Sequence, residues 1–309
     1  MTAPPLTTLR TLTTLRTWSE MIKLQHSVFA LPFAVMAAFL AGTHIDGLHR
    51  PHAGQLTLIV VCMVAGRSVA MTYNRIVDAA IDARNPRTAG RALPAGHLSA
   101  RAAYLLLFIA SAVFAAGCFA FFVFYGNPWP MWLGGPVLLL LCGYSFTKRF
   151  TRWSHFYLGA AIALSPLAAW LAVHPASLGW PALLLAGTVT LWIAGFDIIY
   201  ACQDIDVDRR DGLHSLPARL GPRGALFVTK ICHAGAVLLL IGLIGLVPLG
   251  WLYLAGVTIV AILLAVENSL VRPDDYSRVN LAFFTINGVV SVVLGALTVL
   301  DVLLAAPGE

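Results

Sequence analysis

Charged residues are scarce in this sequence. Asp, Glu, Lys and Arg together make up 11% of the 309 residues, whereas a soluble protein carries about 25%. Hydrophobic residues make up 59%, and the mean hydropathy is +0.82. Long polar linkers are missing too, since none exceeds about thirty residues. The composition excludes a soluble protein and predicts one polytopic helical membrane domain, residues 21–309, after an amino-terminal arm, residues 1–20.

Paired cysteines are absent as well. The five cysteines show neither a CxxC motif nor the Cys and His spacing of a zinc site, and all lie in or beside apolar runs. Small buried thiols are the better interpretation, so neither disulfides nor zinc are predicted. No signal peptide is predicted, because the first apolar run, near residues 24–42, is long enough to span a membrane and has no convincing cleavage site. That run predicts an uncleaved first helix.

Apolar runs recur along the whole chain. Most contain the roughly 20 residues that a helix needs to cross a bilayer core. We therefore expect an all-α integral membrane protein, a bundle of about nine transmembrane helices around a central cavity that opens to the cytoplasmic side. The predicted helices cover residues 22–43, 55–73, 101–125, 130–147, 154–173, 179–201, 225–247, 249–268 and 279–304.

Basic residues are distributed very unevenly between the two sides of this predicted bundle. With the amino terminus in the cytoplasm, only Arg50 of the 20 Lys and Arg residues lies on the opposite side, and Arg67 falls inside a span. The positive-inside rule then places the amino terminus and the polar loops in the cytoplasm, in a membrane that we expect to be the bacterial inner membrane. The net charge of +6 is thus mainly a topology signal. We predict a membrane lipid environment and no nucleic-acid partner.

Half of the 14 acidic residues lie in two short stretches at the predicted cytoplasmic ends of spans. Asn74, Asp78 and Asp82 follow each other at four-residue steps, which puts their side chains on one face of a helix. The second stretch repeats this device, since Asp204 and Asp208 are four residues apart. Asp197, seven residues before Asp204, is expected on the same face. We predict that these two faces point at each other.

Clustered carboxylates at a membrane boundary repel each other and are costly to desolvate. Mg²⁺ removes both objections, because it binds one or two carboxylates together with the oxygens of a substrate phosphate. Such a site would hold a diphosphate, and nearby basic side chains would neutralise the remaining charge. Arg67, seven residues before Asn74 on its face, and Lys148 are candidates.

A diphosphate site in a membrane suggests a substrate with a long hydrocarbon chain. Ionising an allylic diphosphate requires stabilisation of the leaving group and a dry, aromatic pocket for the cation. Most aromatic residues of such a chain are ordinary core or lipid-facing side chains. The candidates for the pocket are Phe29, Phe33, Trp170, Trp192, Phe196 and Tyr200.

Four segments in order resemble the UbiA-type membrane prenyltransferases, which attach polyprenyl chains to aromatic acceptors. They are NRIVDAAID at 74–82, the loop that ends in RALPAG at 91–96, YSFTKRF at 144–150, and DIIYACQDIDVD at 197–208. Each motif alone is weak, but their combination on nine spans is specific, and the resemblance covers essentially the whole chain after residue 20. Many family members carry Asn-Asp where this chain has Asn74 and Arg75. Arg75 is expected to lie off the shared face, so the metal site should survive.

The resemblance implies a role for each of these residues. It implies that Mg²⁺, and through it the diphosphate, is bound by Asn74, Asp78, Asp82, Asp204 and Asp208. It implies that the diphosphate is held or ionised with the help of Arg67, Tyr144 and Lys148. Asp197 is expected either to bind metal or to orient Tyr200 or a ligand.

The resemblance implies the transfer of a polyprenyl group from a polyprenyl diphosphate to an aromatic acid in quinone biosynthesis. The segments 82–88, 212–221 and 280–294 are similar to those of 4-hydroxybenzoate polyprenyltransferases or of menaquinone-pathway enzymes, and the sequence does not separate these acceptors. A haem, chlorophyllide or glycerol phosphate acceptor is a further alternative. The carboxylate of an aromatic acid needs a basic partner, for which Lys23, Arg67 and Arg149 are options.

A cation-coupled transporter is the alternative outside the enzymes, because transporters also carry intramembrane carboxylates. Transport sites, however, tend to lie near the bilayer midplane, whereas the predicted acidic residues lie at the ends of spans. A transporter also has little use for a Lys-Arg pair that holds diphosphate on the same side. The sequence therefore favours the enzyme.

Overall fold

The structure is a computed structural model, and it describes residues 14, 16–21, 29–45 and 50–305. Its regular elements are helices, as predicted. Among the described residues, eight helical segments are long and apolar enough to cross a membrane, and some of these segments consist of two helices with a short irregular turn between them. A ninth, shorter apolar helix precedes them. The helices are α2 (Leu31–Gly42), α3 (Ala53–Asp82), α4 (Ala100–Tyr125), α5 (Trp129–Thr147), α6 (Ser154–Val173), α7 (Trp180–Ala201), α8 (Ile205–Arg210), α9 (Leu216–Leu243), α10 (Trp251–Leu270) and α11 (Asn287–Leu304).

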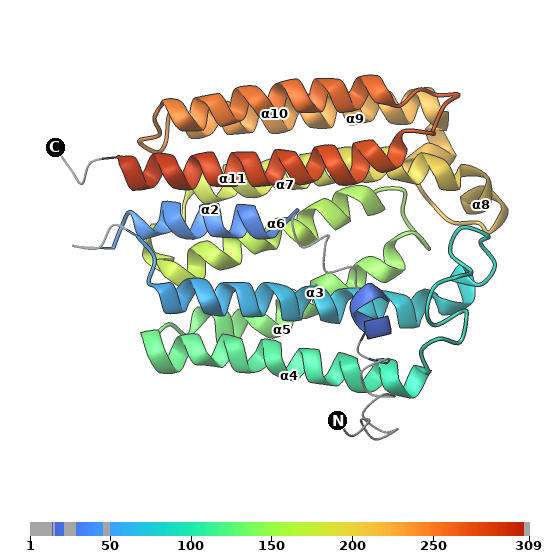
Figure 1. Ribbon diagram of the computed structural model, residues 1–309, viewed down its shortest axis with the longest axis horizontal. Coiled ribbons are helices and arrows are strands. Elements are labelled where there is room, and N and C mark those ends of the chain that lie inside the picture. The colour runs from blue at the N-terminus through green and yellow to red at the C-terminus, as the bar shows by residue number, and fades with distance from the viewer. Residues whose placement is uncertain (1–13, 15, 22–28, 46–49, 306–309) are drawn as a thin grey trace, which may run out of the picture.

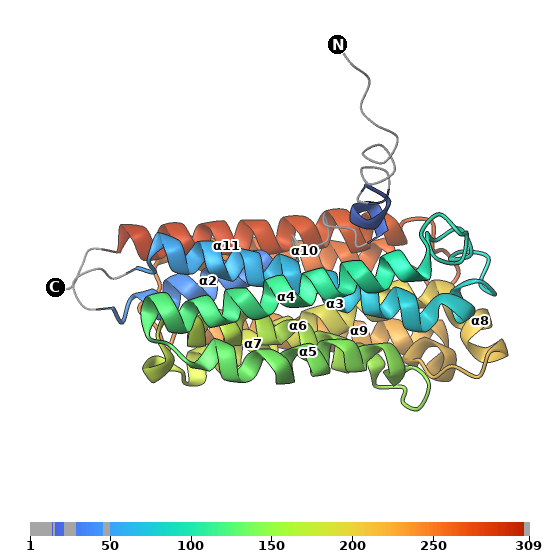
Figure 2. The same ribbon diagram turned by 90° about the horizontal axis from the view of Figure 1, so that it is seen from below.

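The long helices lie roughly parallel to one another and form a bundle (Figures 1 and 2). α3, α4 and α5 pack together on one side, and α9, α10 and α11 form the other. α2, α6 and α7 lie between them, with α6 packed along α7 and α7 along α9. Most connections are short, so the arrangement brings the end of α3 and the end of α7 to the same end of the bundle.

Local sequence signals explain where several of these helices begin and end. The Ser99 hydroxyl accepts a hydrogen bond from the backbone N–H of Ala102 at the start of α4, and Ser215 does the same for Ala218 in α9. Gly126 ends α4 in the left-handed conformation, with φ of 63°, which favours glycine. Gly221 also has positive φ and marks a kink inside α9. Our predicted start of this span, residue 225, is therefore too late.

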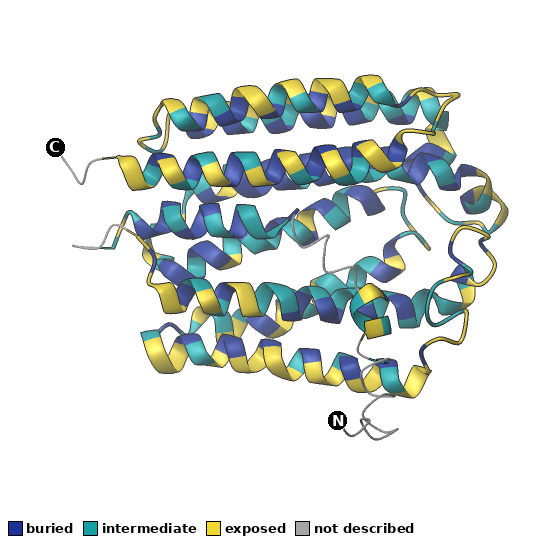
Figure 3. Cartoon of the chain, in the orientation of Figure 1, coloured by how far each residue is buried: buried dark blue, intermediate teal, exposed yellow. Residues whose placement is uncertain are grey.

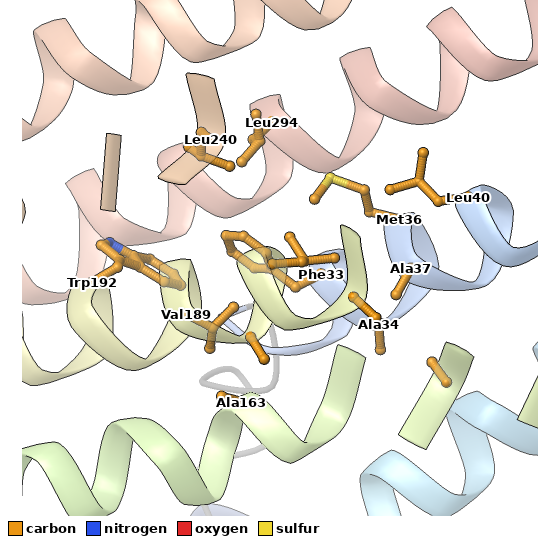
Figure 4. Packing of buried hydrophobic residues seen from close by; sticks show 14 of the residues in the cluster. Phe33, Ala34, Met36, Ala37, Leu40, Ala163, Val189, Trp192, Leu240 and Leu294 are labelled. Carbon is orange, nitrogen blue, oxygen red and sulfur yellow. The ribbon is translucent and has the colours of Figure 1, made fainter. Parts of the chain in front are cut away.

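The core of the bundle is apolar and closely packed. Phe33, Met36 and Leu40 of α2 belong to one buried cluster with Trp192 of α7 and Leu240 of α9 (Figure 4). Along the outer helices, exposed residues face outward and buried ones inward (Figure 3). Many exposed residues of α4 are large and hydrophobic, as a lipid-facing surface requires. This pattern is that of an integral membrane protein.

Two connecting segments, residues 83–99 after α3 and the α8 region after α7, lie side by side at one end of the bundle, on the right of Figure 1. The Arg210 guanidinium donates a hydrogen bond to the Arg84 carbonyl, which joins the two segments. Part of the predicted amino-terminal arm also packs on the bundle, where the Trp18 indole N–H donates to the Thr72 hydroxyl of α3 at 2.9 Å. Residues 1–13 and 15 lie outside the described residues.

Candidate active site

One cavity at the α8 end of the bundle gathers both acidic stretches. Its volume is about 290 Å³, and the residues that line it include members of α3, α5, α6, α7 and α8 and of the segment after α3. Lys23 lies outside the described residues. All the other predicted site residues line this cavity, namely Arg67, Asn74, Asp78, Asp82, Tyr144, Lys148, Arg149, Asp197, Tyr200, Asp204 and Asp208.

The first acidic stretch forms the last turns of α3, where it is held by hydrogen bonds along one face. The Asn74 amide donates to the Asp78 carboxylate at 2.7 Å and to the Ser145 hydroxyl at 3.3 Å. Its carbonyl oxygen accepts a hydrogen bond from Arg75 at 2.9 Å. Arg75 also lines the cavity and is buried. Arg75 was expected to lie off the face that Asn74 shares with the two carboxylates, but its side chain lines the cavity and binds the Asn74 side chain.

The two carboxylates of α3 are each paired with an arginine. The Arg91 guanidinium donates to both oxygens of Asp82, at 2.6 and 2.7 Å, from the segment that follows α3. Asp78 accepts a hydrogen bond from Arg149 at 3.2 Å. Since both carboxylates are largely buried, these ion pairs offset much of the penalty of removing them from water.

Asp204 in the second stretch is held by a side chain from the opposite segment. Arg87 donates to its two oxygens at 2.9 and 2.6 Å and to the Tyr200 hydroxyl at 2.9 Å. Burial alone lowers the pKa of the Arg87 guanidinium, but its hydrogen bonds to Asp204 raise that pKa above the ordinary value. The guanidinium therefore stays charged. This forked contact ties the segment after α3 to the end of α7.

Two buried polar atoms of residues that line this cavity have no hydrogen-bond partner among the described residues. One is an oxygen of Asp208, which lies 3.8 Å from the Lys148 ammonium, beyond hydrogen-bond distance. The other is the Nε of Arg67. A buried carboxylate oxygen and a buried guanidinium nitrogen left unsatisfied are unfavourable, and each calls for a ligand of the opposite charge.

Asp197 is turned toward a histidine of the neighbouring helix. The Nδ1 of His155, a completely buried residue of α6, lies 2.6 Å from a carboxylate oxygen of Asp197. This contact fixes the orientation of Asp197 at the cavity wall. The contact involves one of the two carboxylate oxygens of Asp197, which also lines the cavity.

The second acidic stretch is not one continuous helix. A short 3₁₀ turn, Cys202–Asp204, separates α7 from α8. The prediction that Asp197, Asp204 and Asp208 share the face of a single helix is therefore wrong in its geometry. The three side chains nevertheless line one cavity, because the chain turns into α8 at this end.

Aromatic side chains close the inner wall of the cavity. Phe29, Phe196 and Tyr200, three of the predicted aromatic residues, line it. Phe283 joins them, with ring centroids 5.0 Å from Phe196 and 4.5 Å from Tyr200. Trp192 lies behind Phe196, and Phe33 behind Trp192.

Trp170, also proposed for this wall, does not line the cavity. Its indole N–H donates instead to the Ser177 hydroxyl, beyond the other end of α6. Hydrophobic periodicity alone cannot tell which end of a span faces the site.

Several residues that line the cavity were not predicted from the sequence. Phe283 and Phe284 lie in a π-helix, Leu281–Ile286, which widens the helical turn and brings both rings to the cavity. Nothing in the apolar run indicated this local geometry. Arg87 and Arg91 were overlooked as partners of the acidic residues, although two arginines four residues apart, directly after an acidic helix end, were a usable signal.

The donor set has the chemistry of a site for a hard divalent cation and an anion. Among the described residues, no three carboxylate, histidine or cysteine side chains are close enough together to hold a metal ion as they stand. Four acidic side chains are instead paired with Lys or Arg around one cavity. An entering anion with several oxygens would engage these basic groups, which frees carboxylate oxygens for a cation. The residues present therefore fit a cation bound together with a phosphate-type anion.

Comparisons with known proteins agree with this architecture. The model of the UbiA prenyltransferase family matches residues 30–289. A 4-hydroxybenzoate octaprenyltransferase of Nitrosococcus oceani is 31% identical over 255 residues, which cover 82% of this chain and 86% of the relative. One of Dechloromonas aromatica is 31% identical over 232 residues, covering 74% and 75%.

Solved structures show the same fold. The apo structure of a UbiA homolog from Aeropyrum pernix has a TM-score of 0.78 and 31% sequence identity, and the match covers 89% of this chain and 98% of that one. A UbiA homolog from Archaeoglobus fulgidus, bound to DMAPP and Mg²⁺, has a TM-score of 0.66 and 17% identity, and the match covers 93% and 99%. The chain belongs to the UbiA prenyltransferase family and is an integral membrane prenyltransferase.

Proposed function

We propose that this protein transfers a polyprenyl group from an allylic polyprenyl diphosphate to an aromatic acid such as 4-hydroxybenzoate, in quinone biosynthesis. The carbon–oxygen bond to the diphosphate breaks, and the diphosphate leaves with the electron pair. The aromatic ring forms the new carbon–carbon bond and then loses a proton. The observation that carries this proposal is the single cavity in which acidic side chains from two helix ends, basic side chains and an aromatic wall meet.

The basic residues of the cavity are suited to hold the diphosphate. Lys148 and Arg149 follow α5, and Arg87 and Arg91 approach from the segment after α3. All four now neutralise carboxylates, so they are already charged and positioned when the donor enters. The unpartnered Nε of Arg67 gives a further anion contact deeper in the bundle, for the diphosphate or for the acceptor carboxylate.

Mg²⁺ is the cation that we propose for this site, where it would stabilise the charge of the leaving diphosphate. Asn74, Asp78 and Asp82 on α3, with Asp204 and Asp208 at the other helix end, would hold it. Their carboxylate and amide oxygens are the ligands that Mg²⁺ prefers. Tyr144, which also lines the cavity, would contact the diphosphate beside Lys148.

The aromatic wall is suited to the reacting end of the prenyl chain. Phe29, Phe196 and Phe283 form a continuous group of rings, with centroid separations of 5.0 to 5.8 Å. Ring faces attract a developing cation, and the group keeps water away from it. A cation protected in this way reacts with the acceptor ring rather than with water.

The acceptor and the orientation in the membrane belong to the proposal. 4-Hydroxybenzoate is favoured because the relatives from Nitrosococcus oceani and Dechloromonas aromatica are 4-hydroxybenzoate octaprenyltransferases. A naphthoate-type menaquinone precursor is the alternative. The basic residues at the cavity end support the proposal that this end lies, with the amino terminus, on the cytoplasmic side of the bacterial inner membrane. Both of these relatives are enzymes, so a transport function has no support.

The test is a transfer assay on membranes that contain this protein. A labelled polyprenyl diphosphate and Mg²⁺ are supplied with 4-hydroxybenzoate, with a naphthoate acid or with no acceptor, and the lipid product is identified. We expect prenylated 4-hydroxybenzoate, and no product after chelation of divalent cations. Prenylated naphthoate alone would move the proposal to the menaquinone precursor. Hydrolysis of the donor without any prenylated acid would contradict it.

A further inference from the structure

A second cavity lies beside the first. Its volume is about 440 Å³, and it lies between the segment after α5 and the segment that enters α9. Leu213 lines both cavities. We call this second cavity the basic pocket, and the residues of interest in its wall are Phe150, Arg152, Trp153, Arg209, His214 and Arg219.

The charge of the basic pocket is one-sided. Three arginines, from three different segments of the chain, line it together with His214, and no acidic residue of the described part of the chain does. Within the described part of the chain, no ion pair is formed by Arg152, Arg209 or Arg219. This differs from the active-site cavity, where carboxylates neutralise the basic groups. Like charges gathered around one space repel each other, and an anion in that space removes the repulsion.

Two of the three guanidinium groups are fixed in place by neighbours that carry no charge. The Nε of Arg209 donates to the Ala218 carbonyl at 2.9 Å, which leaves its terminal nitrogens available. The Arg152 guanidinium lies over the Trp153 ring, 5.3 Å from its centroid. Positioned guanidinium groups of this kind bind phosphate oxygens in pairs of parallel hydrogen bonds.

The rim of the pocket carries exposed aromatic side chains close to the end of a candidate membrane span. Phe150 is 69% exposed and Trp153 is 51% exposed, directly after the end of the α5 span. Exposed aromatic side chains at the end of a span are typical of the headgroup region of a bilayer. Basic pockets in that region bind the headgroups of anionic lipids.

A backbone hydrogen bond holds together the two segments that form the pocket. The backbone N–H of His214 donates to the Lys148 carbonyl at 2.7 Å, so the two segments that form the pocket are held together. Ser215 is buried at the start of α9. The space between the segments is therefore part of the fold, and a ligand there would lie next to the segments that carry Lys148 and Asp208.

We propose that the basic pocket binds a phosphate-bearing anion, and that the aromatic rim favours the headgroup of an anionic phospholipid as its source. This site is separate from the active-site cavity, and the proposal holds whatever the acceptor of the enzyme is. A free phosphate offers the same oxygens to the three arginines, so the two sources must be separated by competition.

The experiment compares two variants with the same change in charge. The pocket variant carries Arg152→Gln, Arg209→Gln and Arg219→Gln. The control carries Arg101→Gln, Arg272→Gln and Arg278→Gln, three exposed arginines at the same end of the bundle that do not line the pocket. Phosphatidylglycerol bound to each purified protein is measured by native mass spectrometry during titration in phosphatidylcholine nanodiscs. A thermal unfolding scan confirms that each protein is folded.

We expect the pocket variant to bind phosphatidylglycerol at least about tenfold more weakly than the unaltered protein, and the control to change less than about twofold. The single substitution Arg219→Gln, at an exposed position, should give a smaller loss in the same direction if the triple variant is unstable. Equal losses in the pocket variant and the control would overturn the proposal, since only the general charge of this face would then matter.

The source of the phosphate is determined in a second arm, in which inorganic phosphate or glycerol phosphate is added at millimolar concentration. Persistence of bound phosphatidylglycerol supports the lipid headgroup. Displacement of the lipid from the unaltered protein supports a free phosphate as ligand of the same pocket. A lipid signal that neither the anion nor the pocket substitutions reduce would overturn the proposal.

Discussion

The two acidic helix ends of this protein reach the same cavity by different means. On α3 the helix is regular up to Asp82, and the partner of Asp82 is Arg91, nine residues further along the chain. After α7 the helix is broken by a 3₁₀ turn, and the partner of Asp204 is Arg87, which is 117 residues away in sequence. The Asp82 ion pair is thus local to the first end. The Asp204 ion pair instead joins the second end to the segment that follows the first.

This difference suggests how the charged site is kept intact before its ligands bind. Each carboxylate is desolvated in part, and each has a basic group beside it that would otherwise bind the diphosphate. When metal and donor bind, one set of ion pairs is exchanged for another, and the cavity holds a similar balance of charge before and after. The exchange has different consequences at the two ends, because releasing Arg87 also releases the contact between two segments.

Removing a carboxylate from either helix end should have the largest effect on turnover. We expect Asp78→Asn and Asp204→Asn each to lower the turnover of the transfer assay by at least about 100-fold, because the charge that holds the cation is lost. Loss at both ends would show that the cation requires both. Asp78→Asn with near-normal activity would restrict the metal site to the second end, and the two helix ends would then no longer be equivalent in binding the cation.

Substitution of Lys148 should have the second-largest effect, a loss of affinity for the donor. Lys148 lies 3.8 Å from Asp208 and lines the cavity, and we propose that it binds the diphosphate. Lys148→Ala is expected to weaken donor binding by about 10- to 100-fold, as loss of a charge-assisted contact to phosphate does. The measurement is a titration with a non-hydrolysable polyprenyl diphosphate analogue. Unchanged affinity would mean that the diphosphate is held elsewhere, and Lys148→Arg serves as a control that keeps the charge.

A smaller effect, on proteolytic cleavage, should distinguish the local ion pair of Arg91 from the distant ion pair of Arg87. Arg87 and Arg91 have similar side-chain exposure, 32% and 29%, so their substitution by Gln is a matched pair. Arg87 makes hydrogen bonds to Asp204 and Tyr200 across the cavity, whereas Arg91 binds Asp82 of the preceding helix. We expect Arg87→Gln to increase proteolytic cleavage in residues 83–99 several-fold more than Arg91→Gln. Equal cleavage in both variants would show that the distant pair does not hold the two segments together.

The sequence was sufficient for much of this structure. The apolar runs predicted the helices because most of the runs are long enough to cross a bilayer. The four-residue spacing of Asp78 and Asp82 placed both on one face of a regular helix. The same reasoning failed where the backbone departs from an α-helix. The 3₁₀ turn before α8 and the π-helix that carries Phe283 have no periodic signature in the sequence.

The basic partners of the carboxylates also could not be predicted from residue spacing alone. Arg87 lies in a polar segment without helical periodicity, and its contact with Asp204 exists only because two distant helix ends meet. Arg75 shows a related difficulty, since a long flexible side chain can reach a face that its backbone position does not suggest. Sequence spacing predicts where a backbone places a side chain, but the charge pairs form across the tertiary structure.

Asp211 should show the smallest effect, and it is the internal control for the acidic residues of the second stretch. It does not line the active-site cavity and is paired instead with Arg210 at 3.0 Å and with Arg84 at 3.6 Å. The hydrogen bond from Arg210 is the main cause of a pKa below the ordinary value for this carboxyl. A lowered pKa in the folded state means that the contact stabilises the fold at neutral pH, and that this stabilisation is lost as the pH falls through that pKa.

Asp211→Asn should therefore change turnover less than about twofold at neutral pH. It should lower the unfolding temperature slightly at pH 7 but not in acid. A loss of turnover as large as that of Asp204→Asn would mean that the whole acidic stretch, rather than the face toward the cavity, is required.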